Sequence, residues 1–135
     1  MKVVLANGTV VDALIVTGYQ SYVQGQNRPV LDFAFPETTS IADIDEVFTE
    51  ENCEKITLID DNDNEFIHED YVIRSNLKKE MTVVKKATPD NDEVSEQRVF
   101  VIMAQRTYLE KQVKNLVATQ LEQDEMIAEI LFGEV

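Results

Sequence analysis

The stretch KVVLANGTVVDALIV, residues 2–16, predicts that the chain begins with a β-hairpin. Two valine-rich runs flank Asn7-Gly8. This dipeptide supplies the two positive-φ residues of a type I′ turn, whose twist matches that of paired strands. It is the strongest local signal in the chain, and it predicts that an antiparallel β structure follows.

The second arm of this hairpin, residues 9–23, is too long for one flat strand. Gly18 and Gly25 predict a bulge or bend in it, because glycine within a strand often marks one. The run VLDFAF, residues 30–35, alternates with a period of two and has one apolar face. This pattern predicts a half-buried strand, which Pro36 ends.

A short amphipathic helix is predicted over residues 40–48. Ser40 can accept a backbone N–H of the first turn, and Asp43 places an acidic group at the positive end of the helix. The apolar face is formed by Ile41, Ile44, Val47 and Phe48. We expect this face to pack against the β structure.

The acidic stretch DDNDN, residues 60–64, lies between two β-rich runs, KITLI at residues 55–59 and EFIHEDYVIR at residues 65–74. It does not fit a calcium-binding EF-hand loop. Whether the loop begins at Asp60 or at Asp61, position 6 is not glycine and position 12 is not acidic. Because Asp and Asn adopt turn conformations and bond their own backbone, the stretch predicts a solvated hairpin connection.

Two later runs, LKKEMTVVKKA at residues 77–87 and RVFVIMAQ at residues 98–105, predict further strands. The polar, proline-containing segment between them, residues 88–97, predicts a loop. After the last strand the apolar spacing changes to that of a helix. The chain is therefore expected to form a β-rich domain, residues 1–103, and a C-terminal helix, residues 104–133.

The C-terminal helix carries an apolar stripe at three-four spacing. Its seam positions are Leu109, Val113, Leu116, Gln120, Gln123, Ile127 and Ile130. A helix of roughly 25 to 28 residues is about 40 Å long, more than a domain of this size needs to cover its sheet, so part of it is expected to project. An identical helix from another copy is the simplest cover for the stripe. The alternative is that the helix folds back on its own sheet.

The charge balance narrows the range of partners. The chain has 12 basic and 26 acidic residues, a formal net charge of −14, which repels phosphate backbones and anionic lipid. Neither nucleic acid nor a membrane is an expected partner. The sequence lacks both a run of about 18 apolar residues and a secretion signal at its start, so we expect cytosolic synthesis.

The sequence contains no recognisable catalytic or cofactor motif. Cys53 and His68 are the only residues of their types. No disulfide or zinc set is therefore expected, and we interpret Cys53 as a partly buried side chain and His68 as a strand-surface residue. No glycine-rich phosphate loop is present, which argues against a nucleotide cofactor. The acidic side chains near the short helix fit its solvated side better than a hydrolytic pair. These are Asp43, Asp45, Glu46, Glu50 and Glu51.

Together these patterns predict an α+β fold. We expect a bent antiparallel sheet or a small open β-barrel of about six or seven strands, with one short helix and a long C-terminal helix.

Taken in order, the chain resembles a group of small proteins from the tail or baseplate gene clusters of phages and prophages of Gram-positive bacteria. The resemblance rests on VVLANGTVV, YVQGQNRPVLDFAFP, IADIDEVFTEENCEKITLID, YVIRSNLKKE and VFVIMAQRTYLEKQVKNL, and covers nearly the whole chain. It implies a non-enzymatic structural or assembly protein that associates with itself and with other phage tail proteins. It also implies the host cytoplasm as the location during assembly, with the virion tail as a further location. The resemblance supplies no site residues.

A second hypothesis is a ligand-binding module that recognises a cell-surface glycan or peptide. Tyr19 and Tyr22, with the nearby glutamines Gln20, Gln24 and Gln26, are the side chains that would line such a groove. Tyrosines on a bent strand also commonly pack against neighbouring residues, so both readings remain open.

Overall fold

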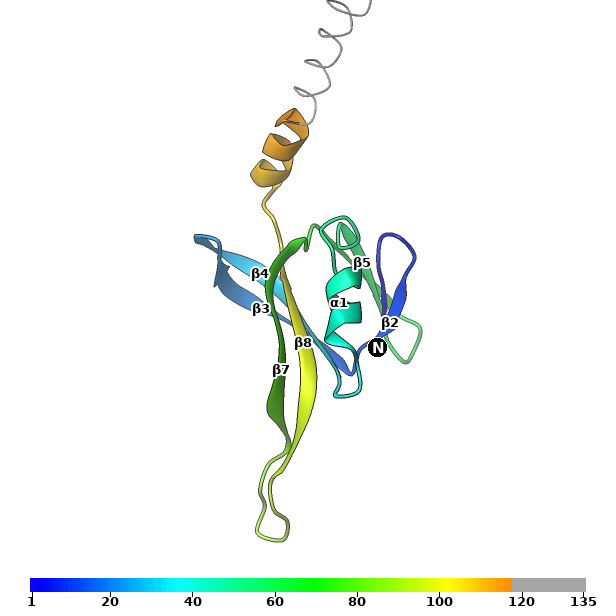
Figure 1. Ribbon diagram of the computed structural model, residues 1–135, viewed down its shortest axis with the longest axis vertical. Helices are drawn as coiled ribbons and strands as arrows, with labels where there is room; N and C mark the ends of the chain where they lie inside the picture. The colour runs from blue at the N-terminus through cyan, green and yellow to red at the C-terminus, as the bar shows by residue number, and fades with distance from the viewer. Residues whose placement is uncertain (118–135) are drawn as a thin grey trace, which may run out of the picture. The chain divides into compact units, whose positions relative to one another are not determined.

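The computed structural model describes residues 1–117, which belong to two units. The first unit, Met1–Gln105, contains two four-stranded antiparallel sheets and one short helix (Figure 1). The second unit begins at Arg106, and its described part contains a helix over residues 108–117. The elements of the first unit are β1 (Lys2–Val4), β2 (Val10–Asp12), β3 (Ile15–Val23), β4 (Gln26–Pro36), α1 (Ile41–Val47), β5 (Lys55–Ile59), β6 (Glu65–Glu69), β7 (Ile73–Lys85) and β8 (Val94–Ala104).

The strand orders of the two sheets are β2-β1-β5-β6 and β3-β4-β8-β7, and neither sheet is closed. The α+β class is therefore confirmed, but the strands form two sheets in place of the one bent sheet or small open β-barrel that was expected. The chain changes sheets at Ala13 and Leu14, where the Ala13 N–H bonds the Met1 carbonyl and the Leu14 N–H bonds the Ala34 carbonyl, at 2.9 and 2.7 Å. Part of the predicted long C-terminal helix, residues 104–133, lies outside the described residues.

The first hairpin forms as predicted, but its turn is of a different type. Gly8 alone has a positive φ, +87°, and its N–H bonds the Leu5 carbonyl at 2.9 Å. The Asn7 side chain accepts a hydrogen bond from the Thr9 N–H at 3.0 Å. The Leu5 N–H bonds the Thr9 carbonyl. These bonds close a longer connection than the two-residue type I′ turn, so that prediction is wrong.

The bulge or bend predicted at Gly18 is absent. Gly18 pairs regularly with Leu31, so β3 runs through it without interruption. Gly25, at φ +84°, and Gln24, at φ +48°, instead form a tight turn that joins β3 to β4. Positive φ at both central residues is the signature of a type I′ turn, which therefore occurs one hairpin later than predicted.

Strand β4 is the centre of the second sheet and is more deeply buried than a half-buried strand. It pairs with β3 on one side and β8 on the other and ends at Pro36, as predicted. Phe33 and Phe35 face the main core, while Val30 and Ala34 on the opposite face are also buried. Both faces of β4 are therefore covered.

One cluster of buried side chains joins both sheets and the short helix. Val3 and Leu58 come from the first sheet, and Phe33 and Val101 come from the second. Phe48, at the end of α1, lies against Phe33 with ring centroids 5.1 Å apart. The sheets and the helix therefore share one core.

Helix α1 matches the prediction in position and in capping. The Ser40 hydroxyl accepts a hydrogen bond from the Asp43 N–H at 3.3 Å. At the other end, the Arg74 guanidinium donates to the carbonyls of Asp45 and Phe48 and pairs with the Asp45 carboxylate. Because Arg74 belongs to β7, these bonds fasten α1 to β7. The positive charge of Arg74 also complements the dipole at the C-terminal end of the helix.

The acidic stretch between β5 and β6 is a turn, as predicted. One carboxylate oxygen of Asp60 accepts the backbone N–H groups of Asn62 and Asn64, each at 2.9 Å. The hydrogen bonds from Asn64 and Asn62 hold the pKa of Asp60 below its ordinary value. The strand predicted for residues 65–74 is divided near Asp70, at φ +66°, where the chain leaves the first sheet and then enters the second.

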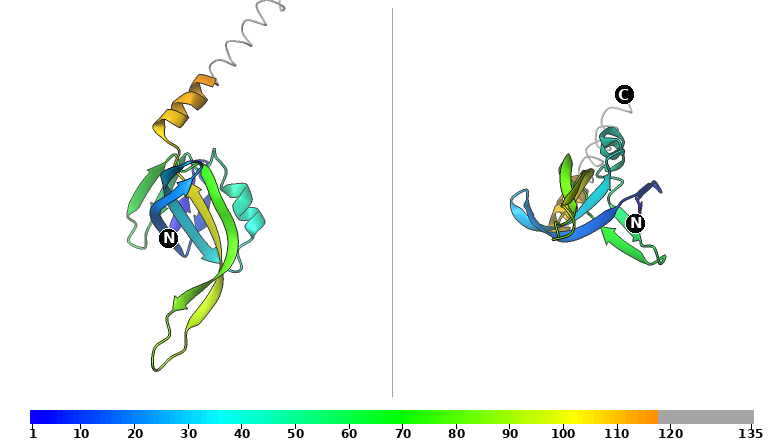
Figure 2. Two further views of the ribbon diagram at one scale, coloured as in Figure 1. Left: turned by 90° about the vertical axis from the view of Figure 1, so that its left-hand side faces the viewer. Right: turned by 90° about the horizontal axis from the view of Figure 1, so that it is seen from below.

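Strands β7 and β8 form a long hairpin whose outer part extends past the other strands of this unit (Figure 2). The loop predicted for residues 88–97 is shorter than expected, because β8 begins at Val94 and pairs with β7 from there. Thr88 and Asn91 bond to each other across the loop. In the part of the chain that the structure describes, no helix is long and apolar enough to cross a membrane.

Candidate interaction surface

The helix of the second unit begins with a reciprocal capping box. The Thr107 hydroxyl accepts the Glu110 N–H at 3.1 Å, and the Glu110 carboxylate accepts the Thr107 N–H at 2.8 Å. Two N–H groups that the first turn leaves without intrahelical partners are thereby satisfied. The sequence TYLE, residues 107–110, carries this signal, so the start of the helix is fixed locally.

Three of the seven predicted association residues lie on this helix, and all three are exposed. Leu109, Val113 and Leu116 retain 72%, 53% and 67% of their accessible surface. Their spacing of four and three residues places them on one side of the helix. The other four predicted residues lie outside the described residues: Gln120, Gln123, Ile127 and Ile130.

The three side chains on this side of the helix are apolar, so they can pack against another apolar surface. They carry no titratable or nucleophilic group that could take part in catalysis. Tyr108 and Val117 are exposed as well, at the two ends of the described helix. Burying a leucine or valine side chain contributes about 1.5 to 3 kcal/mol. We refer to Leu109, Val113 and Leu116 as the helix seam.

The segment predicted to bind a ligand forms the end of the β3–β4 hairpin. Tyr22 is 71% exposed, and the Tyr19 hydroxyl lies 3.5 Å from a carboxylate oxygen of Asp32. Because Tyr19 and Tyr22 are three positions apart in one strand, they point to opposite faces of the sheet. They do not line a common groove.

A buried arginine that no sequence pattern indicated lies close to the turn of the same hairpin. Arg28 is 2% exposed, and its guanidinium donates to the carbonyls of Val23 and Gln105 at 2.9 and 3.1 Å. An arginine is rarely buried unless its donors are bonded. Here it joins the end of β3 to the residue that follows β8, and its role is structural.

The single cysteine and the single histidine lie in different environments. Cys53 is fully buried rather than partly buried, and burial raises the pKa of its thiol to about 12, so the reactive thiolate is disfavoured. His68 lies on β6, half-buried against Tyr71 with ring centroids 5.7 Å apart. Within residues 1–117, no three His, Cys, Asp or Glu side chains are grouped to hold a metal ion.

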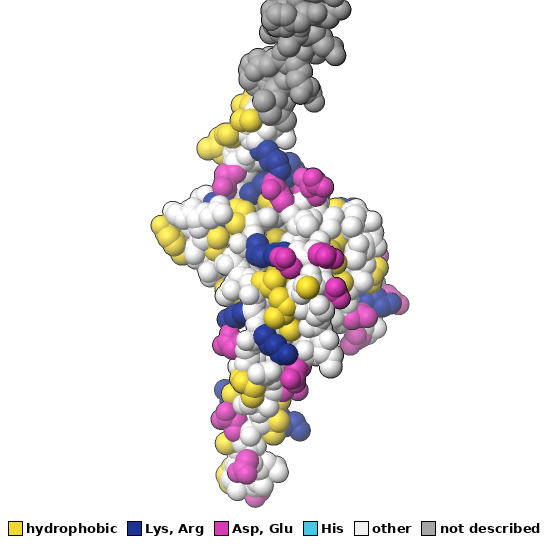
Figure 3. Space-filling view, in the orientation of Figure 1, with side chains coloured by type: hydrophobic (Ala, Val, Ile, Leu, Met, Phe, Trp, Pro, Cys, Tyr) yellow, Lys and Arg dark blue, Asp and Glu magenta, His cyan; other side chains and the backbone are white. Residues whose placement is uncertain are grey.

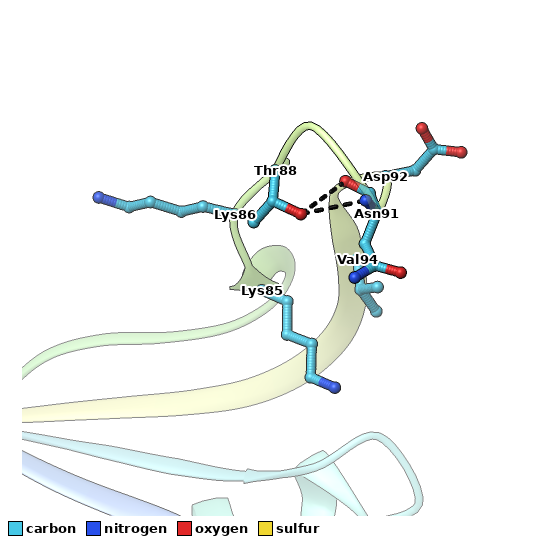
Figure 4. Close-up of a pocket in the computed structure, with 6 residues that line it drawn as sticks. All are labelled: Lys85, Lys86, Thr88, Asn91, Asp92 and Val94. Carbon is cyan, nitrogen blue, oxygen red and sulfur yellow. Dashed lines mark hydrogen bonds between the residues drawn. The ribbon is translucent and has the colours of Figure 1, made fainter.

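The tip of the β7–β8 hairpin carries a hollow of about 650 Å³ (Figure 4). Its lining residues are Lys85, Lys86, Thr88, Asn91, Asp92 and Val94. All six are exposed residues of one loop and the adjoining strand ends. The hollow therefore lacks the buried apolar walls of a small-molecule site.

The sequence matches no family model, and it has no significant similarity to a curated protein or a solved structure.

Proposed function

We propose that the protein is a non-enzymatic structural or assembly protein, of the phage tail or baseplate class that its sequence resembles, and that its copies associate through the C-terminal helix. The observation that carries the proposal is the exposure of Leu109, Val113 and Leu116 at coiled-coil spacing. An exposed apolar stripe of this kind is typical of a protein–protein interaction site. A second copy provides an identical stripe.

The energetics indicate how much of the helix the association needs. Burying the three seam residues of each of two chains contributes roughly 10 kcal/mol. Association costs about 4 to 15 kcal/mol in translational and rotational freedom, so these three positions alone give a weak dimer. A stable dimer therefore also needs the four further positions that continue the spacing in the sequence.

A matched pair of substitutions in the full-length chain tests the seam. Val113→Asp places a carboxylate on the seam, and Asn115→Asp places the same group two residues away, off the seam. Sedimentation velocity is expected to show association of the wild type and of Asn115→Asp, and loss of association in Val113→Asp. A wild type that is monomeric at all concentrations contradicts the proposal. So does Val113→Asp if it associates like the wild type.

The tail or baseplate location requires a separate test. Mass spectrometry of purified particles and assembly intermediates, from a host that carries this gene, should detect the chain. Its absence from both would remove the phage assignment but would leave the helix association standing. The ligand-binding alternative has less support, because its two tyrosines point to opposite faces of the sheet.

A further inference from the structure

The outer part of the β7–β8 hairpin has two unpaired edges. Strand β4 pairs with β8 only as far as Pro36, which is opposite Arg98. Strand β7 lies at the edge of its sheet. Beyond that point, residues 81–85 of β7 and residues 94–97 of β8 pair only with each other among the described strands. We call the longer segment that contains this part, residues 78–98, the ribbon.

The charges of the ribbon are divided between its two strands. The β7 side, residues 78–86, has four lysines and one glutamate, a net charge of +3. The β8 side, residues 90–98, has four acidic residues and one arginine, a net charge of −3. In a chain of net charge −14, a basic edge next to an acidic edge is a marked local pattern. Charged side chains of both signs are visible along the ribbon in Figure 3.

Most of these charges are not used to hold the ribbon itself together. The two ion pairs in the ribbon run along single strands, Lys78 with Glu80 at 2.6 Å and Arg98 with Glu96 at 2.8 Å. Lys85 stands opposite Val94 in the register, so it has no acidic partner across the hairpin.

At the tip, the side chains of Lys86 and Asp92 point away from each other (Figure 4). No ion pair joins Lys85 or Lys86 to another side chain within residues 1–117. The charges near the tip are therefore available to a partner.

We propose that the ribbon is a contact between copies of this chain, in which the β7 edge of one copy pairs antiparallel with the β8 edge of the next. When the tips of two neighbouring ribbons point in the same direction, Lys85 and Lys86 of one copy lie beside Asp92 and Glu93 of the other. The charges indicate that the partner is a second copy, because each copy carries a basic β7 edge and an acidic β8 edge that complement each other. The contact is separate from the helix seam and does not depend on it.

This contact joins two different edges, so it is head to tail and continues from copy to copy until a ring closes or a filament forms. It is also small, because only residues 94–97 of β8 have a free edge. A contact of this size is weak by itself. Since its charges are exposed, it weakens as ionic strength rises.

Charge reversal on each edge tests the proposal. One variant combines Lys85→Glu with Lys86→Glu, and the other combines Asp92→Lys with Glu93→Lys. Both are made in the full-length chain that also carries Val113→Asp, so that the result does not depend on the helix seam. Circular dichroism and thermal melting establish that each variant folds like its parent. Sedimentation velocity at about 20 mM salt then measures self-association.

Each variant alone is expected to associate at least about tenfold more weakly than the parent, because like charges then meet at the contact. An equimolar mixture of the two, or a chain carrying all four reversals, should regain the association of the parent. The proposal is overturned if the parent stays monomeric at this salt concentration. It is equally overturned if either variant associates like the parent, or if the mixture is as weak as its components.

Discussion

Replacing Asp32 by asparagine is expected to stabilise the β-rich unit at neutral pH. Asp32 lies in the middle of β4, on the face opposite Phe33. One of its carboxylate oxygens is buried without a hydrogen-bond partner among the described residues, while the other lies 3.5 Å from the Tyr19 hydroxyl. Burial raises the pKa of Asp32 above its ordinary value, and the ammonium group of Lys78 opposes this shift only in part.

The size of the effect follows from these contacts. Leaving a buried group without a partner costs about 1 to 3 kcal/mol, and more when the group is charged, so replacing the carboxylate by a neutral amide recovers part of this cost. Asp32 is only partly buried and Lys78 lies nearby, so we take the lower end, about 1 kcal/mol. For a unit of this size, that difference raises the melting temperature by roughly 4 to 8 °C.

The direction of the pH dependence is fixed by the raised pKa of Asp32. Between the unfolded value, about 3.9, and the higher folded value, the folded protein binds more protons than the unfolded chain. The wild type therefore gains stability relative to Asp32→Asn as the pH falls through the folded pKa. The advantage of the variant is full above that pKa and disappears near the unfolded value.

Thermal unfolding at neutral and acidic pH, with Asp61→Asn as the control, checks this reasoning. Asp61 is exposed in the turn between β5 and β6, so its substitution removes the same charge without a buried oxygen. An Asp32→Asn variant that is less stable than the wild type at neutral pH would refute the argument. An equal gain at every pH would do so too, since it would have no connection with ionisation.

Three further predictions concern the core, a turn and the thiol. Phe48→Ala should lower the free energy of unfolding by about 3 to 5 kcal/mol in a urea titration, because the buried ring packs on two phenylalanines. The control Ile41→Ala, at a more exposed position of α1, should lower it far less. Gly8→Ala should cost about 1 to 2 kcal/mol because of the positive φ, whereas Gly18→Ala, with its nearest neighbouring atoms at 3.9 Å, should be neutral or slightly stabilising; equal effects would contradict this. Cys53 should resist iodoacetamide in the folded protein and react after unfolding in urea; rapid reaction in the native state would contradict its burial.

The features that the sequence predicted correctly are those with local causes. The cap at Ser40, the turn after Asp60 and the end of β4 at Pro36 each depend on neighbours within a few residues. The division into two sheets has a non-local cause, because β1 pairs with β5, with Lys2 opposite Ile59. No local sequence pattern at Ala13 indicates that the chain changes sheets there. Periodicity therefore identified strands but not their partners.

The two proposed contacts differ in the same way. The helix seam was predictable, because three-four spacing is a property of one segment. The ribbon was not, since its free edges exist only because β4 ends while β7 and β8 continue. The contacts also differ physically: salt screens the charged ribbon edges and leaves the apolar seam intact. An assembly that uses both is expected to lose the ribbon contact first as ionic strength rises, and to keep the helix association.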